Sequence, residues 1–198
     1  MTIIAAAMKN GRCAIASDTA STDGSFTVPA RHIVNHGKLF KCGDTYLGLS
    51  GWSATYDIFE SILRHYRKNL DFSSRAAIFD TATRIHKLMK DEYYVETTED
   101  KEQPVESSQI LALIANPSGI FDLESYRSVG EYTRYWAIGS GKPLAIGAMY
   151  AVYDHYKNPK DIVRTAVEAA CEFEEGCGMP LQMRSFAMAR NKGKRARK

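Results

Sequence analysis

Several features are scarce or missing in this 198-residue sequence, and each absence narrows the class of protein. No apolar run reaches the roughly 20 residues that a membrane-spanning helix needs. The first residues lack the basic start, apolar centre and small-residue cleavage site of a secretory signal. There are four cysteines and no CxxC pair, which argues against a zinc site and a disulfide framework. We therefore expect a cytoplasmic protein without a membrane partner.

Acidic residues are missing from the C-terminal segment, Arg190–Lys198, which carries six basic side chains. Without this segment, 20 basic residues stand against 23 acidic ones, so the rest of the chain is slightly acidic. A chain-wide basic surface is therefore not predicted, and nucleic acid is not an expected partner. We expect one domain over residues 1–189 and a disordered basic tail over residues 190–198. The acidic stretch 95–108 is a second predicted disordered segment.

The N-terminal residues predict a β-hairpin. Asn10-Gly11 lies between two apolar runs and is the preferred pair for a two-residue type I′ turn. Such a turn pairs residues whose numbers add up to 21, so Ile3 faces Asp18. This register brings Thr2 beside Asp18 at the end of the hairpin far from the turn.

A second hairpin is predicted around Gly43-Asp44, which also suits a tight two-residue turn. Its register places Lys38 opposite Leu49 and therefore close to Gly51. Two independently predicted hairpins thus place Asp18 beside the N-terminus and Lys38 beside Gly51.

The remaining pattern predicts four helices and further strands. Apolar residues at helical spacing mark two helices, with the stripes Ala54, Ile58, Ile62, Tyr66, Leu70 and Ile78, Ala82, Ile85, Met89. A third helix, over 142–156, is apolar on nearly every face and is expected to be buried. A fourth begins at Pro159 after the N-cap Asn158. Strands are expected over 109–116, 120–125 and 182–189, and over 134–141, where the strand ends in a glycine turn. Helices grouped between antiparallel strands favour a layered α+β fold.

Thr2 is a candidate nucleophile. A threonine hydroxyl is weak unless a base takes its proton, and an N-terminal threonine carries its own base, an α-amine of pKa about 7.7–8.0. The ammonium of Lys38 would lower the pKa of that amine, and Asp18 would hold Lys38 in place. The N–H of Gly51 could stabilise an oxyanion. Each residue also fits an ordinary role: an N-terminal residue, a strand end, a solvated strand residue and a turn glycine.

At these residues the sequence resembles the proteasome β-type subunits, which are N-terminal nucleophile (Ntn) hydrolases. The segments that carry the resemblance are TIIAAAMKNGRCAIASD, GKLF, LSG, AIGSG and FEEGCG. The similarity spans residues 2–186 and is greatest to the compact bacterial proteasome homologue group. It implies the four-layer α-β-β-α sandwich of Ntn hydrolases.

The resemblance also implies roles for individual residues. It makes Thr2, once Met1 is removed, the nucleophile and base. It implies the catalytic partners Asp18, Lys38, Gly51, Ser140 and Glu174. It implies a substrate-binding set of Thr22, Leu49 and Ser53. It implies a structural cation held by the backbone carbonyls of Cys171, Glu174 and Cys177, and no required cofactor.

The function implied is a self-compartmentalising threonine endopeptidase that cleaves peptides or unfolded proteins through an acyl-enzyme. Homo-oligomeric stacked rings and an ATP-dependent unfoldase partner follow from the same resemblance. Three alternatives stay open. An inactive ring scaffold would keep Met1, and an Ntn amidohydrolase for small amides would have a closed monomeric pocket. A nucleic-acid module would bind through the basic tail with steep salt dependence.

Overall fold

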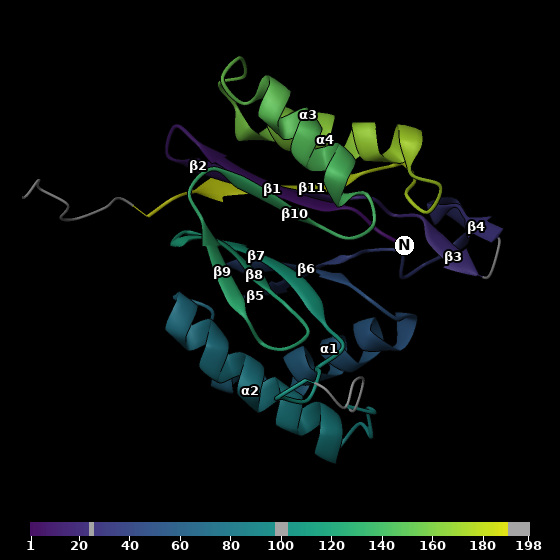
Figure 1. The fold of residues 1–198 in the computed structure, drawn as a ribbon, viewed down its shortest axis with the longest axis vertical. Coiled ribbons are helices and arrows are strands. Elements are labelled where there is room, and N and C mark those ends of the chain that lie inside the picture. Colours follow the sequence, from purple (N-terminus) through teal and green to yellow (C-terminus); the bar gives the residue numbers. More distant parts are fainter. Residues whose placement is uncertain (24–25, 98–102, 190–198) are drawn as a thin grey trace, which may run out of the picture.

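The structure is a computed structural model that describes residues 1–23, 26–97 and 103–189. Its elements form four layers, with two β-sheets face to face and a pair of helices on the outside of each sheet (Figure 1). The predicted α-β-β-α sandwich is therefore confirmed. The predicted basic tail, residues 190–198, lies outside the described residues.

The first sheet is built on the N-terminal hairpin. In the described chain it has the order β10-β1-β2-β11, and its strands are β1 (Ile4–Lys9), β2 (Arg12–Ser17), β10 (Tyr135–Ile138) and β11 (Gln182–Ala187). Asn10 and Gly11 have φ of 51° and 71°, the positive values that a type I′ turn requires. Lys9 pairs with Arg12, and the Asp18 N–H donates to the Ile3 carbonyl, so the predicted register is confirmed.

The second sheet is an antiparallel meander. Its strands follow the chain in order: β5 (Leu39–Cys42), β6 (Thr45–Ser50), β7 (Leu111–Asn116), β8 (Gly119–Leu123) and β9 (Val129–Tyr132). Cys42 pairs with Thr45, and the Leu49 N–H donates to the Lys38 carbonyl at 3.3 Å, as the turn at Gly43-Asp44 predicts. Strand β9 was not predicted from the sequence.

Helices cover the outer face of each sheet. The second sheet is covered by α1 (Ser53–Tyr66) and α2 (Arg75–Asp91), and the first by α3 (Lys142–Val152) and α4 (Pro159–Phe173). The side chain of Asn158 accepts the Lys160 N–H, as expected of the N-cap of α4. No helix in the described ranges is both long enough and apolar enough to cross a bilayer.

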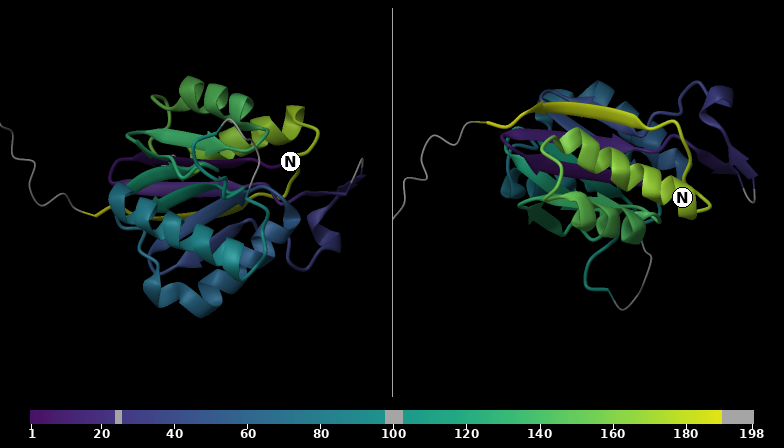
Figure 2. Two further views of the ribbon diagram at one scale, coloured as in Figure 1. Left: turned by 60° about the horizontal axis from the view of Figure 1, so that its bottom comes forward. Right: turned by 90° about the horizontal axis from the view of Figure 1, so that it is seen from above.

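A small ribbon stands apart from the two sheets, beside the N-terminus (Figure 2). It consists of β3 (Ser21–Asp23) and β4 (Phe26–Val28), which pair with each other. Two short 3₁₀ turns complete the secondary structure, η1 (Ala30–His32) and η2 (Arg67–Asn69). The ribbon lies in the segment that joins Asp18 to Lys38 and was not predicted.

The structure corrects the prediction of a buried third helix. Helix α3 ends at Val152 rather than at 156, and only Ala145 and Met149 are buried in it. Tyr150 is 79% exposed. The physical reason is that α3 belongs to an outer layer, where one face meets the sheet and the other faces outward.

Two further expectations are wrong in part. The buried residues of α1 are Thr55, Phe59, Ile62 and Leu63, whereas Ala54 is exposed. Apolar residues also stand next to the predicted stripe, so the spacing alone does not show which side of the helix is buried. The described flanks of the predicted disordered segment 95–108 are ordered. The Ser107 N–H donates to the Thr97 carbonyl at 3.0 Å. Residues 98–102 lie outside the description.

The core has three parts because each sheet is buried on both faces. Ile3 and Ala5 face α3 and α4, while Ile4 and Ala6 face the second sheet, as the alternation of a β-strand requires. The small residues between the sheets allow close approach. A Cβ at Gly48 would lie 2.5 Å from Ile4 Cγ2, so this position leaves no room for a side chain. The two sheets are thereby held at a fixed separation beside Thr2.

Candidate active site

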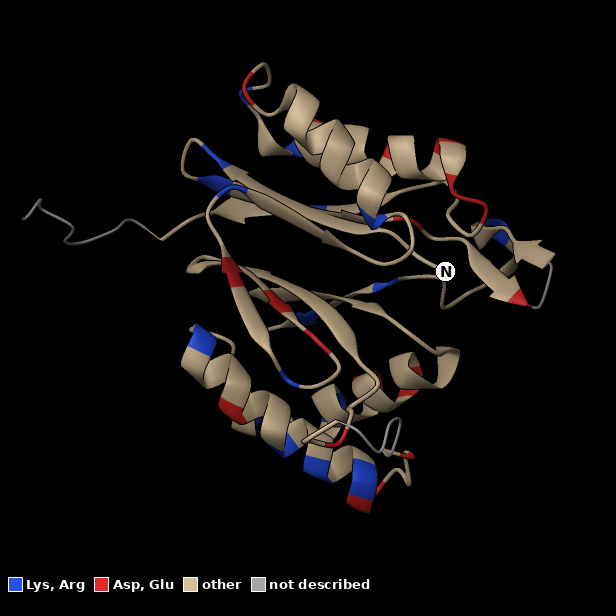
Figure 3. Cartoon of the chain, in the orientation of Figure 1, with Lys and Arg blue, Asp and Glu red and all other residues tan. Residues whose placement is uncertain are grey.

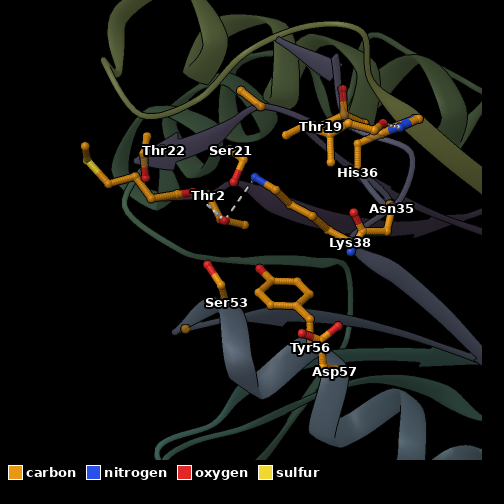
Figure 4. Close-up of a pocket in the computed structure, with 15 residues that line it drawn as sticks. Thr2, Thr19, Ser21, Thr22, Asn35, His36, Lys38, Ser53, Tyr56 and Asp57 are labelled. Carbon is orange, nitrogen blue, oxygen red and sulfur yellow. Dashed lines mark hydrogen bonds between the residues drawn. The ribbon is translucent and has the colours of Figure 1, made fainter. Parts of the chain in front are cut away.

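A cleft of about 170 Å³ opens where the N-terminus reaches the edges of both sheets. Its lining includes Thr2, Lys38, Gly51 and Ser53, which come from three separate segments of the sequence. Figure 4 shows Lys38 reaching toward Thr2 from one side and Tyr56 rising toward it from α1.

Asp18 is the most buried charged group of this site, with no exposed surface. Its Oδ1 accepts from Lys38 Nζ at 2.7 Å and from the Ile3 N–H at 3.1 Å. Its Oδ2 accepts from the Gly178 N–H at 3.2 Å. A buried carboxylate is tolerated when donors of this kind surround it. Asp18 is therefore held in one orientation beside Thr2.

Lys38 connects this carboxylate to the candidate nucleophile. The residue precedes β5 and is buried, and its Nζ donates to Thr2 Oγ at 3.1 Å as well as to Asp18. An ammonium at this distance stabilises negative charge on the oxygen. The Thr2 hydroxyl donates to the Met1 carbonyl at 2.5 Å. The Thr2 oxygen thus sits between an ammonium and the preceding peptide group.

The Thr2 backbone is fixed by the turn between β10 and α3. The Thr2 N–H donates to Ser140 Oγ at 3.3 Å, and the Thr2 carbonyl accepts the Gly141 N–H at 3.4 Å. Gly139 has φ of +98°, and a Cβ there would lie 2.1 Å from the Thr2 carbonyl oxygen. A side chain at 139 would therefore displace Thr2.

The end of α4 supports Ser140 from behind. The Ser140 side chain hydrogen-bonds the thiol of Cys177, and burial raises the pKa of that thiol to about 11, so it stays neutral. The Glu174 carboxylate adds to this rise in the pKa of Cys177, and the Glu174 carbonyl accepts the Cys177 N–H at 3.0 Å. Glu174 therefore affects the site indirectly, through its contacts with Cys177.

Gly51, Ser53 and Thr22 all line the cleft, as the sequence predicted. Gly51 joins β6 to α1, and no partner for its N–H is found in the described part of the chain. Thr22 lies on β3, which among the described strands pairs with β4 alone. One edge of β3 is therefore open beside the cleft.

Leu49 is the predicted pocket residue that the structure places elsewhere. Its side chain is fully buried in the cluster that packs against α1 and α2, and it is not part of the cleft lining. Alternation explains this correction, because residues of β6 point in turn to opposite faces of the sheet. Leu49 contributes its backbone instead, since its carbonyl accepts the Tyr56 hydroxyl at 2.8 Å.

The residues named for a structural cation lie at the end of α4. In the described ranges, no group of three or more His, Cys, Asp and Glu side chains is arranged to hold a metal ion. The predicted site would use the backbone carbonyls of Cys171, Glu174 and Cys177, and that of Glu174 already accepts a hydrogen bond. A cation at this position stays a prediction.

Tyr56 and Asp57 are among the cleft residues that were not predicted from the sequence. Burial raises the pKa of Tyr56, and its hydroxyl donates to the Leu49 carbonyl at 2.8 Å. The spacing of Ser53 and Asp57 is four residues, one helical turn, which could have placed both on the face of α1 next to Gly51.

Solved structures of other proteins share this fold. The chain is similar to BPH from Thiobacillus denitrificans in complex with epoxomicin, with 33% identity and a TM-score of 0.89, covering 96% of this chain and 100% of that one. A second structure of the same BPH gives 33% and 0.89, covering 95% and 99%. Eukaryotic HslV from Trypanosoma brucei shares the fold at 16% identity and a TM-score of 0.70, covering 94% and 99%. No protein-family model and no curated protein matches the sequence.

Proposed function

Because this chain belongs to the bacterial proteasome homologue (BPH) family, whose fold is that of the proteasome β-type Ntn hydrolases, we propose that it is a threonine endopeptidase. One observation carries the proposal: Lys38 Nζ lies 3.1 Å from Thr2 Oγ and 2.7 Å from Asp18. This is a hydroxyl, an ammonium and a buried carboxylate in a single hydrogen-bonded chain at the floor of a cleft.

The proposed mechanism starts with removal of Met1, which frees the α-amine of Thr2. Thr2 Oγ attacks the carbonyl carbon of a peptide bond while the amine takes its proton. Lys38 stabilises the negative charge on the attacking oxygen, and the Gly51 N–H donates to the oxyanion. The C–N bond then breaks, and the leaving amine takes the proton from the Thr2 ammonium.

The second half of the reaction releases the acyl group. Thr2 Oγ holds it as an ester, and the free α-amine removes a proton from water as the water attacks that ester. The ester C–O bond breaks and Thr2 recovers its hydroxyl proton. Ser140 supports both halves by keeping the Thr2 nitrogen in position, 3.3 Å from its own hydroxyl.

Substrate binding in this proposal uses the open edge of β3. An extended peptide that adds to this edge makes backbone hydrogen bonds near Thr22 and passes over Thr2. An exposed strand edge favours an extended peptide over a small amide. We further propose that identical subunits form stacked rings in the cytoplasm, to which an ATP-dependent unfoldase delivers unfolded protein.

The test measures the hydrolysis of fluorogenic peptides by the purified protein, whose first residue is determined beforehand from its intact mass. We expect Thr2→Ala to lower kcat/KM by about 10³-fold or more while the fold survives. We expect Thr2→Ser to keep measurable activity, because the hydroxyl and the amine remain. Epoxomicin, which is found in complex with the BPH of T. denitrificans, should inhibit the wild type. Wild-type turnover in Thr2→Ala would rule out the assignment.

An inactive ring scaffold that keeps Met1 is the second candidate. As long as Met1 is attached, the Thr2 nitrogen is an amide without basic character, and the Met1 carbonyl accepts the Thr2 hydroxyl. Intact mass separates the two functions. A native chain that begins at Thr2 and cleaves peptides supports the peptidase, whereas a chain that keeps Met1 and is inert supports the scaffold.

A further inference from the structure

The turn between β1 and β2 carries basic side chains that the proposed reaction does not use. Figure 3 shows basic residues at this turn, at the end of the sandwich away from the N-terminus. Lys9 and Arg12 flank the turn and lie directly opposite each other in the strand pair. Like charges in that position destabilise a sheet, so the fold alone gives no reason for them. A ligand at this turn would leave the cleft free, because Thr2 lies at the other end of the hairpin.

Two more cations reach the same turn from the segments on either side of α3. The Arg134 guanidinium lies 5.3 Å from the centre of the Tyr153 ring, and Lys9 Nζ lies 4.6 Å from the same centre. The Asn10 side chain, in the turn itself, donates to the Lys157 carbonyl at 2.9 Å. We call these four basic residues the basic end: Lys9, Arg12, Arg134 and Lys157.

The positive charge of the basic end is not balanced by nearby acids. Among the described residues, none of the four forms an ion pair. Asp154 is the one acidic residue in the loop 153–158, which adjoins the turn. Three of the four residues, Arg12, Arg134 and Lys157, are exposed. They can therefore meet an anionic partner without any rearrangement of the core.

The C-terminal segment adds more positive charge at this place. The Met188 N–H donates to the Gly11 carbonyl at 2.8 Å, and the Ala189 N–H donates to the Pro117 carbonyl at 2.8 Å. The last described residues therefore lie against the turn between β1 and β2. Residues 190–198 follow directly and contain six basic side chains and no acid. The sequence thus attaches its most basic segment to the basic end.

The chemistry of these residues fits a nucleic acid better than a membrane or an acidic protein. Residues 190–198 read RNKGKRARK, so they offer no large apolar side chain for a bilayer or for the core of a protein interface. A nucleic acid strand presents phosphates about 3.4 Å apart, and lysine and arginine bind them with release of counterions. Tyr156, in the same loop as Lys157, is 39% exposed and gives a ring on which a base can stack. We propose that the basic end and residues 190–198 together bind nucleic acid through its phosphates, without sequence preference.

The test is fluorescence anisotropy of a labelled single-stranded DNA of about 20 nucleotides, titrated with the full-length chain at about 50 to 200 mM salt. We expect the logarithm of the binding constant to fall with the logarithm of the salt concentration, by about 0.7 for each phosphate bound. The double variant Arg12→Gln, Lys157→Gln should reduce this slope by about 1.4 and weaken binding by about 10-fold at the middle of that range. A full-length variant with glutamine at all six basic positions of 190–198 should also weaken binding and reduce the slope.

The matched control removes the same charge from other places. Lys87→Gln combined with Arg164→Gln changes two exposed residues, one on α2 and one on α4, where Arg164 pairs with Glu168. We expect this variant to keep the affinity and the salt dependence of the wild type. Peptide hydrolysis should be unchanged in all these variants, because the cleft lies at the other end of the hairpin. The test of nucleic-acid binding therefore does not depend on the proposed peptidase.

Four results would overturn the proposal. The first is no binding of the DNA by the wild type at the lowest salt concentration. The second is an equal loss of affinity in the two double variants, which would make net charge responsible. The third is wild-type affinity in Arg12→Gln, Lys157→Gln, which would remove the basic end from the site. The fourth is displacement of the DNA by polyglutamate, or by vesicles that contain phosphatidylserine, as effective as displacement by unlabelled DNA of equal charge.

Discussion

The ammonium of Lys38 has two partners that use it differently. Asp18 needs it as a counter-ion, since a buried carboxylate without a positive partner is costly. Thr2 needs it as a source of positive potential at Oγ. One side chain therefore supports the stability of the hairpin ends and the chemistry of the nucleophile, and a change at Lys38 affects both.

Lys38→Ala is predicted to destabilise the fold as well as to abolish activity. The variant leaves Asp18 buried with two N–H donors and no cation, a change that costs about 3–5 kcal/mol in comparable buried pairs. Thr2→Ala keeps the ion pair and loses one hydroxyl, which costs about 1 kcal/mol. Urea unfolding of both variants measures the difference, with Lys41→Ala, at an exposed position of β5, as the control. Equal stability of Lys38→Ala and Lys41→Ala would contradict the prediction.

At the scale of elements, the turn between β10 and α3 packs directly against the backbone of Thr2. Gly139→Ala is predicted to move Thr2, because the new Cβ would lie 2.1 Å from its carbonyl oxygen. A displacement of about 1 Å in a catalytic group costs on the order of 10²-fold in activity. Peptide hydrolysis by the variant tests this.

The control is Gly147→Ala in α3, where an added Cβ meets no atom within 4 Å. We expect that variant to gain about 0.5–1 kcal/mol, because alanine is the better residue in a helix interior. A Gly139→Ala protein with full activity would show that the turn does not position the nucleophile.

A second element, the segment 103–109, is tied to α2 by a polar cluster. Lys90 donates to Glu106 at 2.5 Å, His86 Nε2 lies 3.0 Å from the same carboxylate, and His86 Nδ1 lies 3.0 Å from Ser108 Oγ. The same segment ends at Gln109, whose carbonyl would be 3.4 Å from a Cβ at Gly51. The cluster therefore lies in the segment that runs beside the turn at Gly51.

This cluster predicts a pH dependence of stability. The hydrogen bond from Lys90, followed by that from His86, lowers the pKa of Glu106 from 4.5 to about 2. A lowered pKa in the folded state stabilises above the ordinary pKa, and that contribution is lost as the pH falls from about 4.5 toward 2. The difference in thermal midpoint between wild type and Glu106→Gln should therefore shrink below about pH 5. Asp80→Asn, on the exposed face of α2, should show no such trend. A difference that is constant from pH 7 to pH 3 argues against the cluster.

Turn chemistry is what made the site predictable from the sequence. Asn10-Gly11 and Gly43-Asp44 each fix a register, and those registers place Asp18 and Lys38 beside Thr2. The direction in which side chains point from a strand or helix was harder to predict from the sequence. Leu49 and Asp57 lie near the site along the chain, but only the faces of β6 and α1 decide that one is core and the other cleft. Which face of an element is buried depends on the elements that pack against it, and the spacing of apolar residues does not identify those elements.

At the scale of the whole molecule, individual outer helices differ in charge. Figure 3 shows α3 with little charge along its length, whereas α2 carries basic and acidic residues along it. Tyr150 on α3 is 79% exposed and Phe173 at the end of α4 is 76% exposed. Exposed apolar surface of this kind marks an interface, and closed symmetry buries it without making filaments.

The chain is therefore predicted to form a large homo-oligomer. Native mass spectrometry at micromolar concentration should give a mass many times the 22.1 kDa of one chain. Tyr150→Glu should reduce the assembled fraction, because a charge in an apolar interface is costly, while Tyr150→Phe should not. A stable and active monomer would contradict the ring assembly and would favour the alternative function, an Ntn amidohydrolase for small amides.

The hairpin registers have a consequence for how the gene can change in length. One codon gained or lost at Asn10-Gly11 shifts Asp18 against Thr2 and reverses the faces of a strand, although the turn lies about 26 Å from the nucleophile. Among the described residues between Asp18 and Lys38, none belongs to a strand of either main sheet. Insertions and deletions can accumulate there without moving Asp18 or Lys38. We therefore expect descendants of this gene to vary in length between Asp18 and Lys38 and to keep a constant length between Thr2 and Asp18.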